Sequence, residues 1–328
     1  MKAVASLRYS IKPVVRKVCT RMVMGKGYEK SMLFDGELPI SAMTVRSEFD
    51  AFCLRQTINA GAEFRVVSAL REVAQSDDHV LLKAGDDELI CRYLIGADGA
   101  NSRVRNLSKE FQNVSLGFAL EACIPMPSRT PIEMEFDFGC VANGYGWVFP
   151  KDDHINVGLY TNSAEIKIHR HELNAYAQQK CGTRLSGTVV GHHIGLGGWG
   201  YNPKLKRVFL IGDAAGLVDP LLGEGIYFAI KSGQIAASAI EQAMLGKEDA
   251  LRSFSAGLKP LQRELHCCHS ASYKFYKKLS HGYFILTLPI TRYALMRGFA
   301  MGIPFSEIQR IWWTFPFRKT PTFSGLYA

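Results

Sequence analysis

The chain has 328 residues, 47% of them hydrophobic, and a formal net charge of +9. This composition supports a folded core and excludes a disordered chain, and the length allows two domains. The eight cysteines form no CxxC pair, and no apolar secretory segment opens the sequence. We therefore expect free thiols and a reducing, cytoplasmic location.

The positive charge is concentrated in residues 251–328, where eleven Lys and Arg face only two acidic residues. The same segment holds fifteen aromatic residues, including Trp312 and Trp313. Basic and aromatic side chains together favour peripheral contact with an anionic membrane surface. A helical bundle with a basic solvated face is an equal alternative, and nucleic acid, which attracts the same charge, is not the expected partner.

The most apolar stretch, residues 283–303, is interrupted by Pro289, Arg292 and Arg297. A membrane-spanning helix needs about 20 consecutive, predominantly apolar residues. We therefore predict no transmembrane helix.

In chain order, the pattern is irregular over residues 1–43 and then predicts a helix at about 46–60, ended by Gly61. Strand patterns follow as an antiparallel meander that ends in a buried strand. The further expected elements are strands over about 114–160, a helix at 164–180, strands at 186–194 and 207–211, a helix at 223–245 and a helical region at 251–328. This order predicts an α/β fold that carries an α+β insertion.

One glycine-rich string is a poor candidate for a nucleotide loop. Residues 195–200 read GLGGWG, which satisfies the G-x-G-x-x-G spacing. The fingerprint requires that the glycines lead directly into a helix, whereas Tyr201-Asn-Pro203 follows here. We interpret this string as a flexible loop at the rim of a cavity.

A first informative motif, GADGANSRVR, covers residues 96–105 after a buried strand. Asp98 stands at the carboxyl end of that strand, and Ser102 is placed to cap a helical turn. A carboxylate and backbone N–H groups at this edge of an open α/β sheet lie where such sheets bind ligands. An ordinary strand-to-helix turn is the alternative.

A second motif, LIGDAAGLVDPLLGEGI, covers residues 210–226. Asp213 follows a short buried strand, and Gly223 and Gly225 lead into a helix that begins near Ile226. The carboxylate suits sugar or ribityl hydroxyl groups, and the positive end of the helix dipole stabilises a developing anion.

Together, in this order, the two motifs resemble those of FAD-dependent oxidoreductases of the para-hydroxybenzoate hydroxylase superfamily, and within it the geranylgeranyl reductase family. The segment RSEFD at residues 46–50, followed by AGAEF at 60–64, is similar to the family's RxxFD helix and the strand after it. Gly216 after GDAA, and Glu224 in GEG, favour a reductase over the aromatic hydroxylases, which typically read GDAAH and GQG.

The resemblance implies an FAD/NAD(P)-binding Rossmann-like domain and a set of cofactor-binding residues. Arg46 would contact the FAD phosphate or ribose, and the backbone of Leu70 would hold the adenine side. Asp213 would bind the ribityl chain or pyrophosphate. The cofactor-binding residues that we expect are Arg46, Leu70, Asp98, Asp213, Gly223, Gly225 and Ile226.

Residues 143–150, NGYGWVFP, resemble the reductases' substrate motif, with Ala142 where the family has proline. Tyr145, Trp147 and Phe149 alternate, so on a strand they would share one face and could line an apolar cavity for a prenyl chain. An aromatic core strand is the alternative.

The family's opening strand, GxGxxG turn and helix do not precede Arg46, so we expect the FAD-binding domain to be incomplete at its N-terminus. The expected domains are 1–110 with 201–250 for FAD, 111–200 as an antiparallel-sheet substrate domain, and 251–328 as the basic, aromatic helical region. No catalytic residue can be named. No metal site is expected either, because the ligands in His266-Cys-Cys-His269 are too closely spaced for structural zinc.

The resemblance implies an enzyme that reduces carbon–carbon double bonds of an isoprenoid or prenyl-lipid substrate, with electrons from NAD(P)H or ferredoxin. An FAD-dependent monooxygenase is the first alternative. A truncated, non-catalytic remnant that binds a membrane or a partner is the second.

Overall fold

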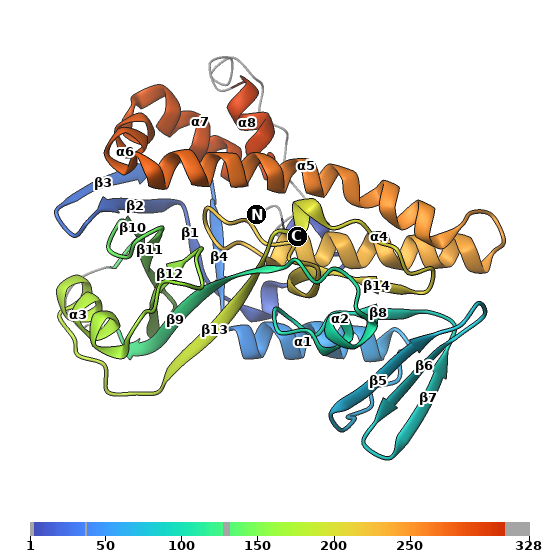
Figure 1. Cartoon of the computed structure of the whole chain (residues 1–328). Helices are drawn as coiled ribbons and strands as arrows, with labels where there is room; N and C mark the ends of the chain where they lie inside the picture. The colour runs from blue at the N-terminus through green and yellow to red at the C-terminus, as the bar shows by residue number, and fades with distance from the viewer. Residues whose placement is uncertain (1–2, 37, 127–131, 312–328) are drawn as a thin grey trace. The chain divides into compact units, whose positions relative to one another are not determined.

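The computed structural model describes residues 3–36, 38–126 and 132–311 (Figure 1). The described chain forms two compact units, each assembled from separate segments. Unit 1 contains the segment up to residue 62, residues 118–192 and the segment from residue 270 on, and unit 2 contains residues 63–117 and 193–269. The functional domain boundaries expected from the sequence stay predictions.

Unit 1 is built on a seven-stranded sheet with the order β13-β9-β12-β11-β10-β2-β3. Its neighbouring strands are antiparallel in the pairs β9·β12, β12·β11, β11·β10 and β2·β3, while β10 and β2 run parallel. The strands are β2 (Arg21–Lys26), β3 (Lys30–Asp35), β9 (Ser115–Pro125), β10 (Met134–Phe138), β11 (Gly144–Pro150), β12 (His154–Thr161) and β13 (Val189–Leu196).

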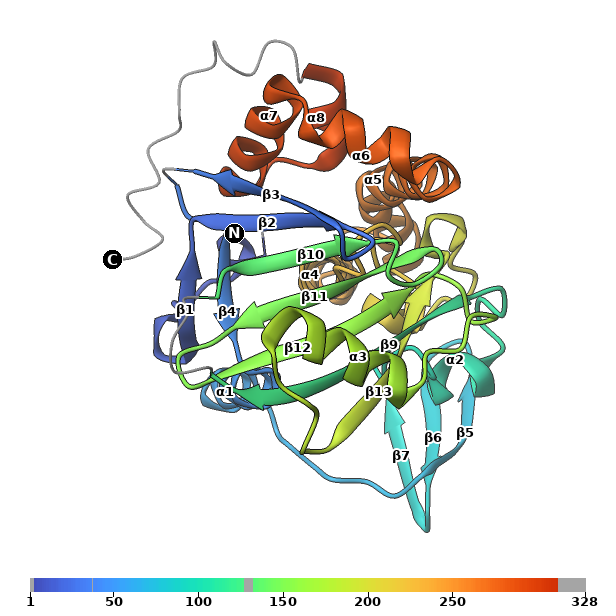
Figure 2. The same ribbon diagram turned by 90° about the vertical axis from the view of Figure 1, so that its left-hand side faces the viewer.

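Helix α3 (Arg170–Cys181) packs on one face of this sheet, as Figure 2 shows. The packing buries Leu173 and Tyr176 of the helix against Ile155 and Val157 of β12. On β12, Ile155 and Val157 alternate with residues that point to the opposite face, because successive side chains on a strand point to opposite sides of the sheet. That opposite face carries the aromatic residues of β11.

The N-terminal segment is not irregular, and the sequence-based expectation for residues 1–43 is wrong. It contains β1 (Val15–Cys19), β2, β3 and β4 (Ser41–Thr44), and β1 pairs with β4. Strand β2 buries Met22 and Met24 and pairs with β10, more than 100 residues away along the chain. A six-residue alternation is a weak signal alone, and this distant partner makes it a strand.

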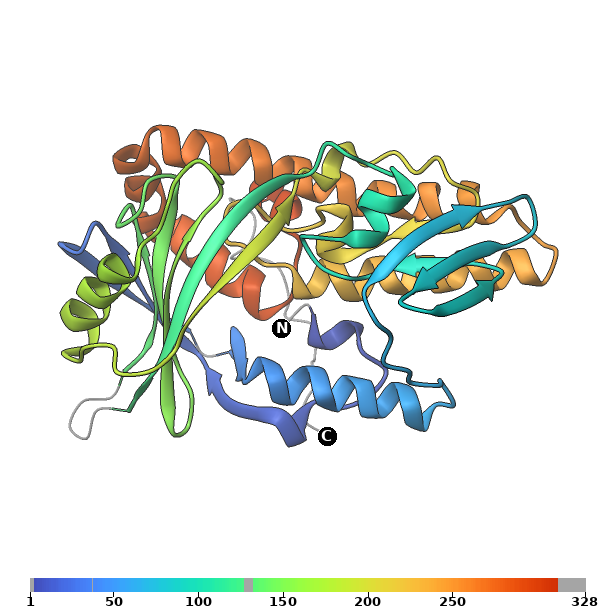
Figure 3. The same ribbon diagram turned by 60° about the horizontal axis from the view of Figure 1, so that its bottom comes forward.

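Unit 2 centres on two parallel strands, β8 (Leu94–Gly96) and β14 (Val208–Leu210). They pack against helices α4 (Ile226–Met244) and α5 (Ala250–Lys277), with Phe209, Phe254 and Leu258 completely buried. An antiparallel sheet of β5 (Leu70–Gln75), β6 (Val80–Ala84) and β7 (Asp87–Cys91) completes the unit together with α2 (Arg103–Ser108), as Figure 3 shows.

The other elements confirm the expected α/β architecture with an antiparallel sheet and a helical C-terminal region. Helix α1 (Arg46–Asn59) lies where the sequence predicts it, and α3 begins six residues later than expected. After α5 come α6 (Leu279–Thr287), α7 (Pro289–Ala300) and α8 (Phe305–Ile311). Trp312 and Trp313 lie outside the described residues.

Within the described residues, no helix combines the length and the apolar composition that a membrane span requires.

Candidate functional site

The two glycine-rich motifs follow neighbouring parallel strands of unit 2. In the register, Leu210 of β14 lies opposite Gly96 of β8, and the amide of Ile211 donates to the carbonyl of Gly96 at 3.0 Å. The loops that contain Asp98 and Asp213 therefore leave the same edge of the sheet. This edge is where open α/β sheets bind their ligands.

Asp98 holds the first loop in shape. One carboxylate oxygen accepts from the Ser102 hydroxyl at 2.5 Å, and the other accepts from the amides of Arg103 and Val104 at 2.7 and 3.1 Å. Ser102 caps α2 by accepting from the Arg105 amide at 2.9 Å. The geometry supports the strand-to-helix turn, and cofactor binding by Asp98 stays a prediction.

Leu70 is engaged through its carbonyl group. The Nε and Nη2 atoms of Arg103 donate to this carbonyl at 3.0 and 2.7 Å. A carbonyl oxygen has two lone pairs, and both are therefore occupied. The backbone contact of Leu70 with adenine stays a prediction.

Arg105 has a structural role that the sequence reading missed. Its guanidinium group is buried and donates to the carbonyl of Ala100 at 2.7 Å and to that of Ala214 at 2.9 Å. Burial lowers the pKa of Arg105, and the Asp98 carboxylate opposes this shift. One side chain thus joins the two motif loops. The sequence signal for this role was the arginine that ends the segment GANSRVR, residues 99–105.

The second loop packs backbone against backbone with the GLGGWG string. The Asp213 carboxylate accepts from the Gly195 amide at 3.3 Å, and the Gly198 amide donates to the carbonyl of Gly216 at 2.8 Å. A Cβ atom at Gly195 would lie 2.2 Å from the carbonyl oxygen of Asp213. Gly195 and Gly198 serve close packing. The string covers the end of β13 and the 3-10 helix Gly198–Gly200, so the expectation that it is a loop is wrong.

Gly225 borders the Asp213 carboxylate at the start of α4. A Cβ atom at Gly225 would lie 3.3 Å from Oδ1 of Asp213 and 3.1 Å from Val218. Gly223 has a φ of 66°, a left-handed conformation that favours glycine. Asp213, Gly223, Gly225 and Ile226 thus lie on one loop and helix start, as the sequence predicts.

A buried acid lies in the same loop. The Asp219 carboxylate accepts from the Leu221 amide at 2.8 Å, and the side chain is 8% exposed. Burial raises the pKa of Asp219 to about 7, and the negative charges of Glu224 and Glu264 add to that increase.

Arg46 belongs to unit 1, whereas the other predicted cofactor residues belong to unit 2. It is the first residue of α1, its side chain is exposed, and it pairs with Asp50 at 3.1 Å. A contact between Arg46 and FAD stays a prediction.

The three predicted substrate residues share one face of β11. The ring centroids of Tyr145 and Trp147 are 6.1 Å apart, and those of Trp147 and Phe149 are 6.0 Å apart. Tyr145 and Trp147 are buried, and Phe149 is half-buried. The indole N–H of Trp147 donates to Asn156 at 2.6 Å.

Further rings extend this aromatic face onto the neighbouring strands. The ring centroid of Phe136 lies 5.4 Å from that of Tyr145 and 5.3 Å from that of Phe149. The ring centroids of Tyr160 and Tyr145 are 5.3 Å apart. Gly158 leaves room for the indole, since a Cβ atom there would lie 2.1 Å from the ring of Trp147. The face is built mainly of aromatic rings, and the indole N–H of Trp147 has its acceptor in Asn156, so the face suits contact with a hydrocarbon chain.

The donor set of the motif loops fits the flavin side of FAD. It combines a carboxylate at Asp213, glycines at 223 and 225 that keep the backbone open, and the N-terminus of the 19-residue helix α4. A carboxylate binds hydroxyl groups, and the positive end of a helix stabilises negative charge on a ring system.

No protein-family model matches the chain. It is 32% identical over 278 residues to an uncharacterised protein of Methanosarcina barkeri, covering 84% of this chain and 70% of the relative. It is 37% identical to the chloroplastic geranylgeranyl diphosphate reductase of Arabidopsis thaliana, covering 47% of this chain and 35% of that protein. It is 31% identical to digeranylgeranylglycerophospholipid reductase 1 of Methanothermobacter thermautotrophicus, covering 68% of this chain and 61% of that protein.

This chain belongs to the geranylgeranyl reductase family. It spans less than two thirds of the length of the two named reductases. The family assignment confirms the resemblance that the paired motifs indicate.

Two solved structures show the same fold. A geranylgeranyl bacteriochlorophyll reductase-like protein from Thermoplasma acidophilum has a TM-score of 0.72 at 20% identity, covering 94% of this chain and 83% of that one. The halogenase PltM, solved in complex with phloroglucinol and FAD, has a TM-score of 0.62 at 13% identity, covering 92% of this chain and 68% of that one.

Proposed function

We propose that this family member is an FAD-dependent reductase of carbon–carbon double bonds in an isoprenoid or prenyl-lipid substrate. The observation that carries the proposal is the placement of Asp213 and the start of α4 at the edge where β8 and β14 end. The named reductases among the relatives, with their prenylated substrates, support the substrate class.

Bound and reduced FAD would supply the hydride for this reaction. Asp213 would hold the ribityl hydroxyls, and Gly225 and Ile226 would face the flavin ring, whose negative charge the α4 dipole stabilises. Arg105 would keep the two loops in a fixed arrangement through Ala100 and Ala214. The contribution of unit 2 is thus a rigid cofactor cradle.

Tyr145, Trp147 and Phe149 would align the prenyl chain along the aromatic face of unit 1. Large rigid rings supply apolar contact area at a low cost in side-chain entropy. Electrons would come from NAD(P)H or ferredoxin. The basic helices that follow residue 251 would place the protein peripherally on a membrane in which a prenyl lipid is dissolved.

The experiment that tests the cofactor claim is flavin quantification in the Asp213→Ala protein. We expect this variant to retain less than about a tenth of the wild-type flavin, because one charge-assisted hydrogen bond contributes about 1.5–3 kcal/mol. The control is Asp86→Ala, which removes the same charge from an exposed turn. Unchanged flavin content in Asp213→Ala would contradict the assignment of this residue.

Product analysis tests the reaction. Saturation of a prenyl double bond without oxygen consumption supports the reductase, whereas oxygen consumption coupled to NADPH would show a monooxygenase. A chain that stays colourless after reconstitution with FAD would overturn both reactions.

A further inference from the structure

A buried lysine lies at the end of the aromatic strand. Lys151 directly follows β11, and its amide donates to the carbonyl of His154 at 2.8 Å to close the β11·β12 hairpin. It continues the alternation of Tyr145, Trp147 and Phe149, so its side chain leaves the sheet on the same face. Only 8% of Lys151 is exposed.

The ammonium group of Lys151 has one weak partner. Within the described part of the chain, its Nζ contacts the thioether sulfur of Met43 at 3.8 Å and makes no ion pair. An ammonium group carries three donors, and a thioether is a weak acceptor. The hydrogen-bonding capacity of this buried cation is therefore largely unused.

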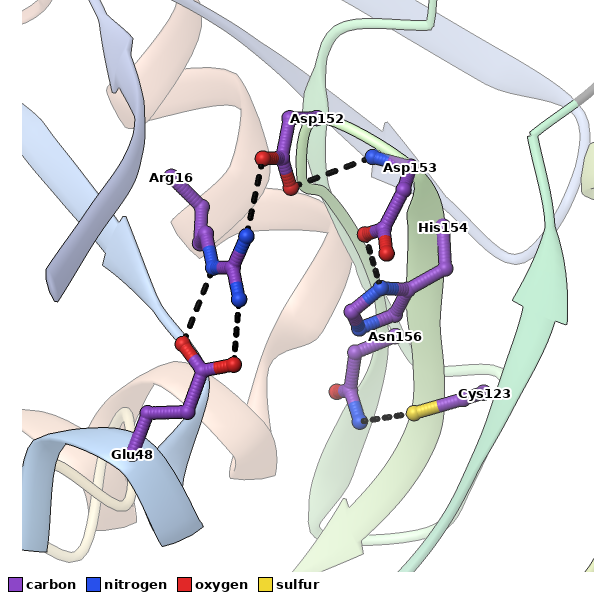
Figure 4. Close-up of polar contacts among 7 residues, drawn as sticks. All are labelled: Arg16, Glu48, Cys123, Asp152, Asp153, His154 and Asn156. Atoms are coloured by element: carbon purple, nitrogen blue, oxygen red, sulfur yellow. Dashed lines mark hydrogen bonds and ion pairs between the residues drawn. The ribbon is translucent and has the colours of Figure 1, made fainter. Parts of the chain in front are cut away.

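The neighbouring carboxylates are already engaged with other groups. Asp152 accepts from Arg16 at 3.1 Å, and Asp153 contacts His154 at 2.5 Å, as Figure 4 shows.

Glu121 acts on Lys151 electrostatically but is directed elsewhere. It accepts from Asn156 at 3.2 Å and lies 3.4 Å from Nε2 of His192. No acidic side chain in the described structure serves as the counterion of Lys151.

A buried ammonium without a counterion is costly, because desolvation penalises the charged form by several kcal/mol. Burial accordingly lowers the pKa of Lys151, and Cys19, Cys123 and Glu121 only partly oppose that shift. An anionic ligand would remove this cost. Of the nearby residues, Cys123 is exposed and Asn156 is half-buried.

We propose that Lys151 binds the anionic head of the substrate, a phosphate or diphosphate group, while the prenyl chain lies along Tyr145, Trp147 and Phe149. The inference rests on the proposed function and adds the polarity of the substrate and its direction on the sheet. On a strand, Phe149 and Lys151 are about 7 Å apart, so a head group at Lys151 continues directly into the aromatic face.

The test compares three ligands by quenching of tryptophan fluorescence in the flavin-loaded full chain. Geranylgeranyl diphosphate carries head and tail, geranylgeraniol carries the tail alone, and inorganic diphosphate carries the head alone. The variants are Lys151→Met, which removes the charge, Lys151→Arg, which keeps it, and Lys83→Met, which removes the same charge from a half-buried position on β6 in unit 2, where the lysine pairs with Glu72.

We expect the wild type to bind geranylgeranyl diphosphate at least about tenfold more tightly than geranylgeraniol, the factor of one charge-assisted hydrogen bond. Lys151→Met should lose this preference while its affinity for geranylgeraniol stays unchanged. Lys151→Arg and Lys83→Met should keep it. Should Lys151→Met fail to fold, Lys151→Gln, which also removes the charge but keeps a polar side chain, takes its place in the same comparison.

Equal affinity of the wild type for the two prenyl ligands would overturn the inference and leave the proposed function intact. Inorganic diphosphate that binds as tightly as geranylgeranyl diphosphate would also overturn it, by showing a site for free anions. A wild type that binds neither prenyl ligand would contradict the proposed function itself.

Discussion

The guanidinium group of Arg105 donates to the carbonyl of Ala214 at 2.9 Å, across 109 positions of the chain. With its second bond to Ala100, it joins the loop after β8 to the loop after β14. Ala100 and Ala214 are themselves buried, so their carbonyl groups need a donor inside the protein, and Arg105 supplies it. The two sequence motifs are therefore one physical unit.

Replacement of Arg105 by methionine should lower the free energy of unfolding by about 2–4 kcal/mol, since two carbonyl groups lose a charged donor. The flavin content of this variant should also fall, because the two motif loops are no longer joined. Urea denaturation measures the first effect and absorbance of the released flavin the second. The comparison variant is Arg103→Met, whose guanidinium is exposed, and an equal loss of stability in both variants would contradict this role for Arg105.

Asp98→Ala should destabilise the protein by about 1–2 kcal/mol, because the carboxylate organises the start of α2 through three hydrogen bonds. Its effect on flavin content should be smaller than that of Asp213→Ala. Denaturant unfolding and flavin quantification on the same samples separate the two effects. Full stability combined with complete loss of flavin would show instead that Asp98 binds the cofactor directly.

The sequence predicts the two motif loops well because their signals are local. A strand end, a carboxylate and glycines at fixed offsets locate Asp213 and Gly225 without knowledge of distant partners. Strands β1 to β4 depend on distant pairing, since β2 lies beside β10, and their short alternation is weak without that partner. Arg105 and Lys151 were missed because their importance comes from which partners each side chain has in the fold.

Gly158→Ala tests the aromatic face. The added Cβ would lie 2.1 Å from the indole of Trp147, so the ring must move and its bond to Asn156 must weaken. We expect a loss of about 1–3 kcal/mol in stability and a shift in tryptophan emission. Gly187→Ala is the control, since its Cβ would meet only the carbonyl of Cys123 at 3.8 Å. An unchanged emission spectrum would contradict the packing of Trp147.

Lys180→Met should destabilise unit 1 by about 3–5 kcal/mol, because a buried carboxylate loses its cation. Lys180 lies 2.7 Å from Glu135 and 2.8 Å from Asp137, which is completely buried. The double variant Lys180→Met with Asp137→Asn should recover part of the loss, since it removes the unpaired charge. Chemical denaturation measures the unfolding free energy of the single and of the double variant. A double variant no more stable than the single one would contradict this account.

Asp219 should make stability depend on pH near neutrality. Its native pKa of about 7 lies above the ordinary aspartate value of 3.8, so the native state holds one more proton than the unfolded state between these values. Stability therefore falls as pH rises through this window and levels off above about pH 7. In Asp219→Asn the side-chain oxygen still accepts from Leu221, and this dependence should disappear.

Between pH 5 and pH 8, the wild type should lose about 3 kcal/mol more unfolding free energy than Asp219→Asn, since each pH unit below the native pKa contributes about 1.4 kcal/mol. Denaturant titrations at pH 5, 6, 7 and 8 measure the difference. Glu224 and Glu264 lie near Asp219 and raise its pKa, so Glu264→Gln should reduce the difference. Parallel pH profiles for the wild type and Asp219→Asn would mean that the carboxylate of Asp219 is solvated or paired in the native protein.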